Sequence, residues 1–343
     1  MPSVSPFRAL RYDETVAGPL ADLVAPPYDV IDAEARRQYL ERSPFNVVHL
    51  TLPESEEEAG RMLADWRLEG ALREEEPALW WIAQGYTGPD GVERTREGFA
   101  GSIQVTPYED GNVLPHERTH AGPKEGRLRL LRQTRTQLEP IFLLYDADPP
   151  LSRPEGDPEL DVSENGVRTR VWRLPAQEVE IDVPLLIADG HHRYETAVAF
   201  NGEEPSATHT FAVLVSSRSP GVEIFPTHRV VQELAADPGG MMTSAWDQSA
   251  LTLYRHENFF RLDTDDELDA RAVERFAAAD VTYTPYAEEA IQAVDDGEAE
   301  AAFLVRAPTI AQVAAFAARG EMMPQKSTFF YPKLTSGVLL HPV

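Results

Sequence analysis

The sequence predicts an α/β protein, because segments typical of buried strands alternate with segments typical of helices along most of the chain. Short apolar runs bounded by turn residues, such as 141–145 and 210–215, are typical of buried strands. Longer segments, such as 56–72, carry apolar residues on one helical face. A chain of 343 residues is long enough for two domains. We expect a mixed sheet, with an N-terminal and central α/β region at 1–232 and an α/β C-terminal region at 233–343.

Turn and cap residues divide the chain into its expected elements. Asp32 is expected to cap the helix that follows it, and a turn at 89–91 to join two strands. Trp80 and Trp81 are expected in the core. In chain order, the expected strands are 7–12, 79–83, 99–105, 141–145, 167–174, 183–188, 210–215, 251–254, 281–283 and 301–305. The expected helices are 33–42, 56–72, 125–138, 194–200, 266–278, 287–294 and 309–318.

The centre of the chain carries a strand, a glycine turn and a helix in succession. The apolar run 183–188 is typical of a buried strand, and 194–200 has alanines at helical spacing without a helix breaker. Asp189 and Gly190 supply the tight turn between them, where glycine adopts conformations that other residues avoid. Three basic side chains follow in the first turn of the helix: His191, His192 and Arg193.

Basic side chains in the first turn of a helix indicate an anion site. That turn has unpaired backbone N–H groups and the positive end of the helix dipole, so cations there are unfavourable unless an anion offsets them. We interpret the cluster as a phosphate-binding site. The alternative is a solvated surface on which Asp189 caps the helix and Glu195 neutralises the cluster.

The composition excludes several classes of function. A net charge of −26 argues against broad nucleic-acid binding through a basic face. The absence of cysteine excludes disulfides, thiolate nucleophiles and cysteine-ligated metals. No apolar run approaches membrane-spanning length, and the N-terminus lacks a signal core. We expect a cytoplasmic protein with no membrane or nucleic-acid partner, and the oligomeric state is open.

A polar loop at 114–127 contains the sequence His116-Glu-Arg-Thr-His120, which matches the H-E-x-x-H pattern of zinc proteases. That chemistry requires both histidines on one continuing helix, whereas a proline precedes the pattern and Gly-Pro follows it. We therefore expect no metal-ligating residues here. The loop leads into a basic helix whose arginines either help to hold phosphates or form surface salt bridges: Arg127, Arg129, Arg132 and Arg135.

Only three of the 31 basic residues are lysines, namely Lys124, Lys326 and Lys333. Where arginine is so dominant, a retained lysine indicates a place that needs a compact ammonium group. Lys326 and Lys333 lie in the segment 323–334, which is bounded by prolines and contains three aromatic residues. We interpret this segment as a binding loop. It is not a P-loop, because the preceding glycines and strand are missing.

Two further positions have both a structural and a functional interpretation. Asp29 follows Pro-Pro-Tyr at a turn and is either a turn-forming aspartate or a site residue. His228 and Arg229 lie at a strand end within the segment 224–231 and are either structural or part of a substrate site.

Four stretches together resemble the bacterial and archaeal family called domain of unknown function 1015. They are Ala25-Pro-Pro-Tyr-Asp-Val-Ile31, the Pro115-His-Glu to Gly-Pro-Lys124 segment, Ala188-Asp-Gly-His-His-Arg-Tyr-Glu-Thr-Ala197, and Met323-Pro-Gln-Lys-Ser-Thr-Phe-Phe-Tyr-Pro-Lys333. The resemblance runs nearly end to end, and the chain departs from it between about 238 and 283. Gly190-His-His-Arg-Tyr194 also resembles the phosphate-binding strand–turn–helix of the ParB/sulfiredoxin fold. His191 stands where sulfiredoxin has its catalytic cysteine, so sulfinic-acid reduction is excluded.

The resemblance implies a ParB/sulfiredoxin-like nucleotide-binding core with an additional C-terminal region. ParB proteins hold CTP with a related motif, and free-serine kinases carry a similar element. It therefore implies a kinase that transfers phosphate to a small hydroxylated metabolite, such as serine or a hydroxy acid, with ATP or ADP (or CTP) and Mg²⁺. The candidate catalytic residues are Asp29, Glu117, Asp189 and Lys124. The candidate phosphate-binding residues are Gly190, His191, His192, Arg193 and Lys326, and the candidate substrate residues are His228 and Arg229.

Two alternatives remain open. A nucleotide-binding regulator would use the same pocket as a switch, with slow or no catalysis. A metal-dependent hydrolase would use His116 and His120 as ligands.

Overall fold

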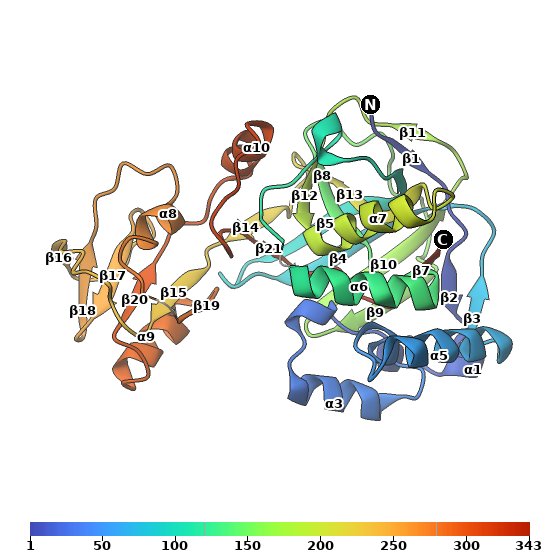
Figure 1. Cartoon of the computed structure of the whole chain (residues 1–343), viewed down its shortest axis with the longest axis horizontal. Coiled ribbons are helices and arrows are strands. Elements are labelled where there is room, and N and C mark those ends of the chain that lie inside the picture. The colour runs from blue at the N-terminus through green and yellow to red at the C-terminus, as the bar shows by residue number, and fades with distance from the viewer. Residues whose placement is uncertain (120, 279) are drawn as a thin grey trace. The chain divides into compact units, whose positions relative to one another are not determined.

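The computed structural model describes residues 1–119, 121–278 and 280–343, and the chain divides into two compact units (Figure 1). Unit 1 comprises Met1–Val222 and Pro332–Val343, and unit 2 comprises Glu223–Tyr331. The division differs from the expected boundary after residue 232 in two ways. Unit 2 begins ten residues earlier, because the strand after Val222 already pairs within unit 2. The last segment returns to unit 1, where its final strand pairs with a strand of that unit.

The large sheet of unit 1 is mixed. Its main path runs in the order β6-β12-β8-β13-β5-β4-β10-β9, and β1 and β11 pair with each other beside β5. β13 runs parallel to β8, whereas β12 is antiparallel to β8 and parallel to β6. The strands are β1 (Ser3–Ser5), β4 (Leu79–Thr87), β5 (Glu93–Gln104), β6 (Val113–Leu114), β8 (Ile141–Tyr145), β9 (Leu160–Glu164), β10 (Val167–Leu174), β11 (Val179–Glu180), β12 (Leu185–Asp189) and β13 (His209–Ser216).

Helices and two small strand pairs complete unit 1. Helix α6 packs against both α5 and α7, and Figure 1 shows α6 and α7 side by side in front of the sheet. The helices are α1 (Glu14–Ala17), α2 (Leu20–Leu23), η1 (Tyr28–Val30), α3 (Ala33–Arg42), α4 (Val48–Thr51), α5 (Glu56–Leu68), η2 (Tyr108–Asp110), α6 (Ala121–Thr134) and α7 (His191–Glu203). The small pairs are β2 (Leu10–Tyr12) with β3 (Leu72–Glu74), and β7 (Thr136–Gln137) with β22 (His341–Pro342).

Unit 2 is a second α/β structure with its own core. Its sheet has the order β16-β18-β17-β20-β15-β19, and a separate pair joins β14 to β21. Two apolar clusters contain buried residues of this sheet, one including Phe303 and the other Leu304. The elements are β14 (Glu223–Phe225), β15 (His228–Val231), β16 (Met241–Thr243), β17 (Thr252–Arg255), β18 (Asn258–Arg261), α8 (Asp269–Val273), β19 (Val281–Thr284), α9 (Ala287–Asp295), β20 (Ala301–Leu304), α10 (Ile310–Ala318) and β21 (Phe329–Tyr331).

The α/β fold class and mixed sheet predicted from the sequence are confirmed. The bounds of α3, β8 and β10 match the expected ones, and the Asp32 side chain caps α3 by accepting from the Ala35 N–H at 2.8 Å. Trp80 and Trp81 are buried in the core. No helix in the described part of the chain is long and apolar enough to cross a membrane.

Several expected helices have different bounds. The helix expected at 194–200 is α7, which is longer at both ends and spans His191–Glu203. The helix expected at 56–72 ends at Leu68, because Gly70 adopts a positive φ of 79° and the chain then enters β3. The helix expected at 125–138 is α6, which begins at Ala121 and ends at Thr134, where Arg135 has a φ of 48°. The helix expected at 266–278 is reduced to the five residues of α8.

Candidate functional site

The turn between β12 and α7 leaves a helix N-terminus without a side-chain cap. β12 ends at Asp189, and Gly190 has a φ of 96° and a ψ of 29°, in the left-handed region that favours glycine. Gly190 is the N-cap of α7, and no side chain caps this end among the described residues. The start of α7 therefore lacks a side-chain cap, and an anion site at this helix end stays a prediction.

Asp189 lies between two cations at this turn. Its Oδ2 accepts from Arg193 Nη2 at 2.5 Å, and its Oδ1 accepts from Lys333 Nζ. Arg193 Nη1 also donates to the carbonyl of Pro140. All three charged side chains are at least four-fifths buried. The carboxylate therefore holds Arg193 against the turn and holds Lys333 beside the N-terminus of α7.

The charges of this trio reinforce one another. Burial opposes ionisation of Asp189, but the positive charges of Lys333 and Arg193 outweigh it, so the pKa of Asp189 is well below its ordinary value. Burial lowers the pKa of Lys333 and of Arg193, but the negative charges of Asp189 and of other nearby acids, Asp29 among them, together outweigh burial and raise both. All three groups are ionised at neutral pH, with one positive charge in excess.

His191 contributes a neutral ring. Its Nε2 accepts from the backbone N–H of His116 at 3.3 Å, which leaves the proton of the neutral ring on Nδ1. The two rings meet edge to face with centroids 4.7 Å apart. Burial, and then the nearby charge of His116, lower the pKa of His191 well below its ordinary value, and burial lowers that of His116 to about 4. His191 therefore presents its backbone N–H to an anion, and its side chain is not one of the cations that the sequence suggested.

A second group of residues lies close to this trio. The buried Glu139 accepts from the Tyr28 N–H at 3.0 Å and from Ser336 Oγ at 2.9 Å. The guanidinium of Arg127 lies 4.1 Å from the centre of the Tyr28 ring. Asp29, the next residue in η1, is exposed. This group fixes the Tyr28–Asp29 segment through backbone and ring contacts.

The two groups share one electrostatic environment. The charge of Asp29 acts on both Lys333 and Arg193 and raises their pKa values. Burial raises the pKa of Glu139, against the lowering effect of Arg193 and Arg127. Arg127, Glu139 and Arg193 also line one small cavity of about 50 Å³. The sequence allowed both a structural and a functional interpretation of Asp29. In the structure, its charge acts on Lys333 and Arg193 at the α7 turn.

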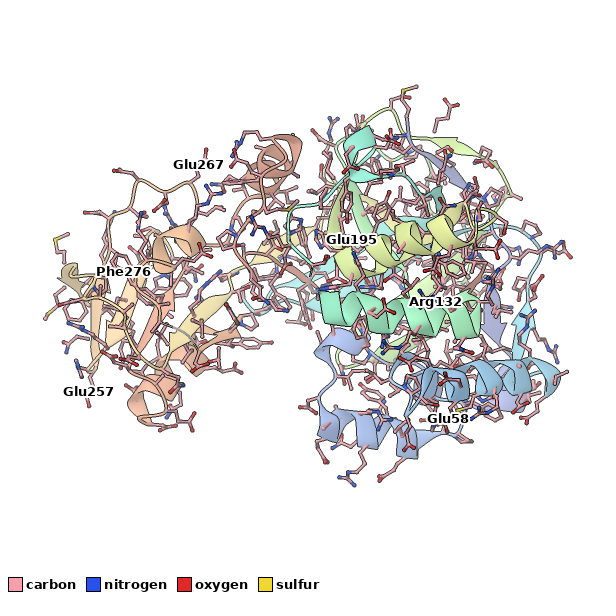
Figure 2. All side chains as sticks on the ribbon, in the orientation of Figure 1. Glu58, Arg132, Glu195, Glu257, Glu267 and Phe276 are labelled. Atoms are coloured by element: carbon pink, nitrogen blue, oxygen red, sulfur yellow. The ribbon has the colours of Figure 1, made fainter. Side chains whose placement is uncertain are left out.

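The polar loop before α6 docks on α7. Thr119 Oγ1 and Lys124 Nζ both donate to Glu195 Oε2, at 2.7 and 3.3 Å, and Figure 2 labels Glu195 on α7. Glu117 lies in this loop and is half-buried. His120 lies outside the described residues. His116 precedes α6 and belongs to no helix, so it lacks the helical setting of the zinc-protease pattern.

From the sequence, the arginines of α6 either hold phosphates or form surface salt bridges. In the structure, most of them form surface salt bridges. Arg129 pairs with Glu56, Arg132 with Glu203, and Arg135 with Glu204. Figure 2 labels Arg132 on α6. Arg127 differs, because it donates to the carbonyl of Thr51 at 2.8 Å and stacks on Tyr28. Only Arg127 of the four therefore joins the residues around Asp29.

Three of the candidate residues belong to unit 2. His228 and Arg229 begin β15 and are buried, and Arg229 Nη2 donates to the carbonyl of Lys326 at 3.2 Å. Burial lowers the pKa of His228 to about 4, and its Nδ1 accepts from the Val305 N–H at 3.2 Å. Within unit 2, these residues form a group of their own.

Sequence reasoning missed two residues of the site. The sequence shows Lys333 as one of three lysines, but its pattern does not assign this residue to the site. In the structure, Lys333 is the lysine that contacts Asp189. The rarity of lysine was the signal that could have found it. Glu139 gave no signal, because a single glutamate between a helix and a strand has no distinctive spacing.

Several solved structures are similar to part of the chain. A free serine kinase in complex with AMP is 16% identical with a TM-score of 0.43, and the similarity covers 68% of this chain and 89% of that chain. A conserved hypothetical protein from Pyrococcus furiosus is 15% identical with a TM-score of 0.39, over 68% and 93% of the two chains. SbnI from Staphylococcus aureus, with a C-terminal truncation, is 11% identical with a TM-score of 0.41, over 69% and 85%.

No curated protein matches the chain. The family described as "Protein of unknown function (DUF1015)" matches residues 4–242, which is more than half of the chain. Three of the four motifs lie in this range, and the motif at 323–333 lies beyond it. The chain therefore belongs to the DUF1015 family.

Proposed function

We propose that this protein is a nucleotide-dependent phosphotransferase with a ParB/sulfiredoxin-like core, and that it acts on a small hydroxylated metabolite such as serine or a hydroxy acid. The observation that carries the proposal is the uncapped N-terminus of α7, with Lys333 and Arg193 held beside it by Asp189. Backbone N–H groups at a helix N-terminus, together with an excess positive charge, are the features that bind phosphate groups. The motif at 188–197, which resembles that of free-serine kinases, supports the same activity.

The residues divide into three roles in this proposal. The backbone N–H groups of His191 and His192, in the first turn of α7, hold the phosphates of ATP or ADP. Lys333 stabilises the charge that develops on the transferred phosphoryl group. Lys124, whose ammonium is bound to Glu195, supports the loop over α7 instead of contacting phosphate.

Asp29 is the general base in this proposal. The acceptor hydroxyl oxygen forms a bond to the γ-phosphorus of ATP, the bond from that phosphorus to the ADP oxygen breaks, and the hydroxyl proton passes to the Asp29 carboxylate. Asp29 is favoured over Glu117 because its charge acts on Lys333 and Arg193, the two cations at the proposed phosphate site.

Mg²⁺ would be held here mainly by the phosphate oxygens of the nucleotide, since hard cations prefer oxygen ligands. Bound there with ATP, it would supply further neutralisation of phosphate charge. Asp189 does not fit as a ligand in this arrangement, because both of its oxygens accept from Arg193 and Lys333.

The experiment is a phosphotransfer assay with ATP, Mg²⁺ and either serine or glycerate, with phosphorylated product measured by mass spectrometry. We expect product with at least one acceptor, and we expect Asp29→Asn to lower kcat about a hundredfold while the affinity for ADP stays within twofold. Asp22→Asn, at an exposed aspartate seven residues earlier, is the matched control. ADP binding without turnover of any small alcohol would instead favour the nucleotide-binding regulator.

A further inference from the structure

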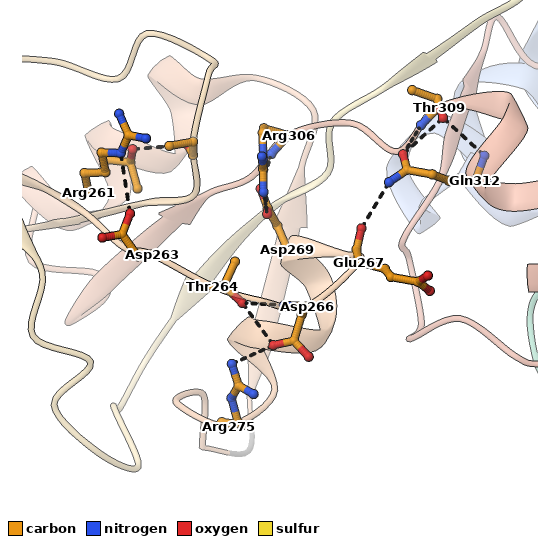
Figure 3. A network of polar contacts seen from close by, with 12 residues as sticks. Arg261, Asp263, Thr264, Asp266, Glu267, Asp269, Arg275, Arg306, Thr309 and Gln312 are labelled. Atoms are coloured by element: carbon orange, nitrogen blue, oxygen red, sulfur yellow. Dashed lines mark hydrogen bonds and ion pairs between the residues drawn. The ribbon is translucent and has the colours of Figure 1, made fainter.

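Unit 2 contains a pocket of about 390 Å³ whose lining residues all belong to that unit. Its wall combines the start of β15, the segment 264–270, the segment 306–312 and Ser327. Figure 3 shows several of these side chains and the contacts between them. The volume is within the range of small-molecule sites, about 300 to 1,000 Å³. None of the catalytic roles assigned above uses this pocket.

An ion pair fixes one part of the wall. The Asp269 carboxylate is buried and accepts from the Arg306 backbone N–H at 2.8 Å and from Arg306 Nη2 at 2.5 Å (Figure 3). Arg306 Nε lies 3.0 Å from the same carboxylate. Because the charges of Asp269 and Arg306 satisfy each other, this pair shapes the pocket without requiring a ligand.

Arg229 is a buried cation of the wall, and nearby carboxylates such as Asp269 act on its charge from a distance. Its side chain is nearly buried, with 4% of the residue exposed, and its two terminal nitrogens donate to the carbonyls of Thr227 and Lys326. Within the described parts of the chain, Arg229 forms no ion pair with a carboxylate. Burial lowers its pKa to about 10. A buried cation that borders a pocket is stabilised by an anion in that pocket.

The wall also carries negative charge. Asp266 accepts from Thr264 Oγ1 at 3.0 Å and pairs with Arg275 at 2.6 Å, and Glu267 is largely exposed and pairs with Arg319 at 3.0 Å. Unlike Arg306, the partners Arg275 and Arg319 do not line the pocket, so these two carboxylates present negative charge to it and repel a free phosphate or a dicarboxylate. They also attract an ammonium group. A ligand that satisfies both kinds of charge has one carboxylate and one ammonium.

We propose that the pocket of unit 2 binds a free amino acid, with its carboxylate on Arg229 and its ammonium facing Asp266 and Glu267. The ligand is a small zwitterion because the wall offers, among its described residues, a buried cation that forms no ion pair beside acidic groups. This proposal does not depend on the phosphotransferase activity, because all of the residues that carry it lie in unit 2 and none takes part in the proposed reaction.

The test is calorimetric titration of the full chain, without nucleotide, with each of L-serine, L-aspartate and L-lysine. Acetate and methylammonium are titrated as probes that carry only the carboxylate or only the ammonium, and inorganic phosphate is titrated as a different anion. We expect at least one amino acid to bind, and acetate, methylammonium and phosphate to bind at least tenfold more weakly. Failure of all three amino acids to bind, or binding of acetate or phosphate with equal affinity, would overturn the proposal.

Two variants, Ala307→Trp and Arg229→Met, locate the binding site, and two others serve as controls. Ala307→Trp fills the pocket and should weaken binding at least tenfold, whereas Ala311→Trp, at an exposed position of α10 that does not line the pocket, should leave it unchanged. Arg229→Met should abolish binding, and Ala307→Trp remains informative if that variant does not fold. Binding should persist in Lys333→Met, which separates this pocket from a substrate site in unit 1. Binding that is unchanged in Ala307→Trp or lost in Lys333→Met would contradict the proposal.

Discussion

Replacement of Lys333 by methionine is expected to slow phosphotransfer about a thousandfold, which corresponds to about 4 kcal/mol of transition-state stabilisation. The ammonium of Lys333 contacts Asp189 beside the first turn of α7, and its pKa is raised by the charge of Asp189 despite burial. Methionine keeps an unbranched apolar chain of similar length but has no charge to place against a transferring phosphoryl group. The measurement is kcat in the assay with ATP and the accepted alcohol.

The matched control for this change is Arg168→Met. Arg168 is exposed and forms a surface pair with Asp161 at 2.5 Å, so its loss removes a cation from unit 1 without touching the site. We expect its rate to remain within twofold of the unsubstituted protein. A Lys333→Met protein that folds normally and retains the full rate would show that the cation beside Asp189 has no part in the reaction.

Replacement of Asp189 by asparagine is expected to lower the free energy of unfolding of unit 1 by about 3 kcal/mol. Asparagine keeps the shape of the side chain but removes the charge between Lys333 and Arg193, so two buried cations then lose the carboxylate that both of them contact. Chemical denaturation, followed separately for the transition of each unit, measures the change. Asp161→Asn, which breaks an exposed pair with Arg168, should cost less than about 1 kcal/mol.

The pH dependence of this deficit has a definite sign. Because the pKa of Asp189 is lower in the folded chain than in the unfolded chain, its charge stabilises the fold fully above the unfolded value of about 3.9. That contribution is lost as the pH falls below about 3.9 towards the lower pKa that Asp189 has in the folded chain. The difference between the unsubstituted protein and Asp189→Asn should therefore be constant above about pH 5 and shrink in acid. A deficit that grows as the pH falls would contradict the charge assignment.

Local sequence patterns predicted the turn at the centre of unit 1 because its causes are local. Gly190 adopts a positive φ that favours glycine, so a strand, a turn and a helix could be predicted from one stretch, and anion binding at the start of that helix stays a prediction. Asp32 and its helix were predicted for the same reason, since a cap and the helix that it begins are neighbours in sequence.

The partners of that turn could not be predicted in the same way. Lys333 and Asp189 are 144 residues apart, and they meet because the chain returns to unit 1 at Pro332 after forming unit 2. The neutral state of His191 likewise depends on burial against His116, 75 residues away. Burial and long-range pairing depend on the whole fold, so they could not be predicted from the spacing of residues within one segment.

Calorimetric titration with ADP tests most directly whether the N-terminus of α7 is a phosphate site. The titrated proteins are the unsubstituted chain, Lys333→Met, and Arg168→Met as the control. We predict that ADP binds the unsubstituted protein and Arg168→Met with the same affinity, and that Lys333→Met binds at least tenfold more weakly, because a charge-assisted contact to phosphate is lost. Equal binding of ADP by all three proteins, or no binding by any of them, would contradict the account.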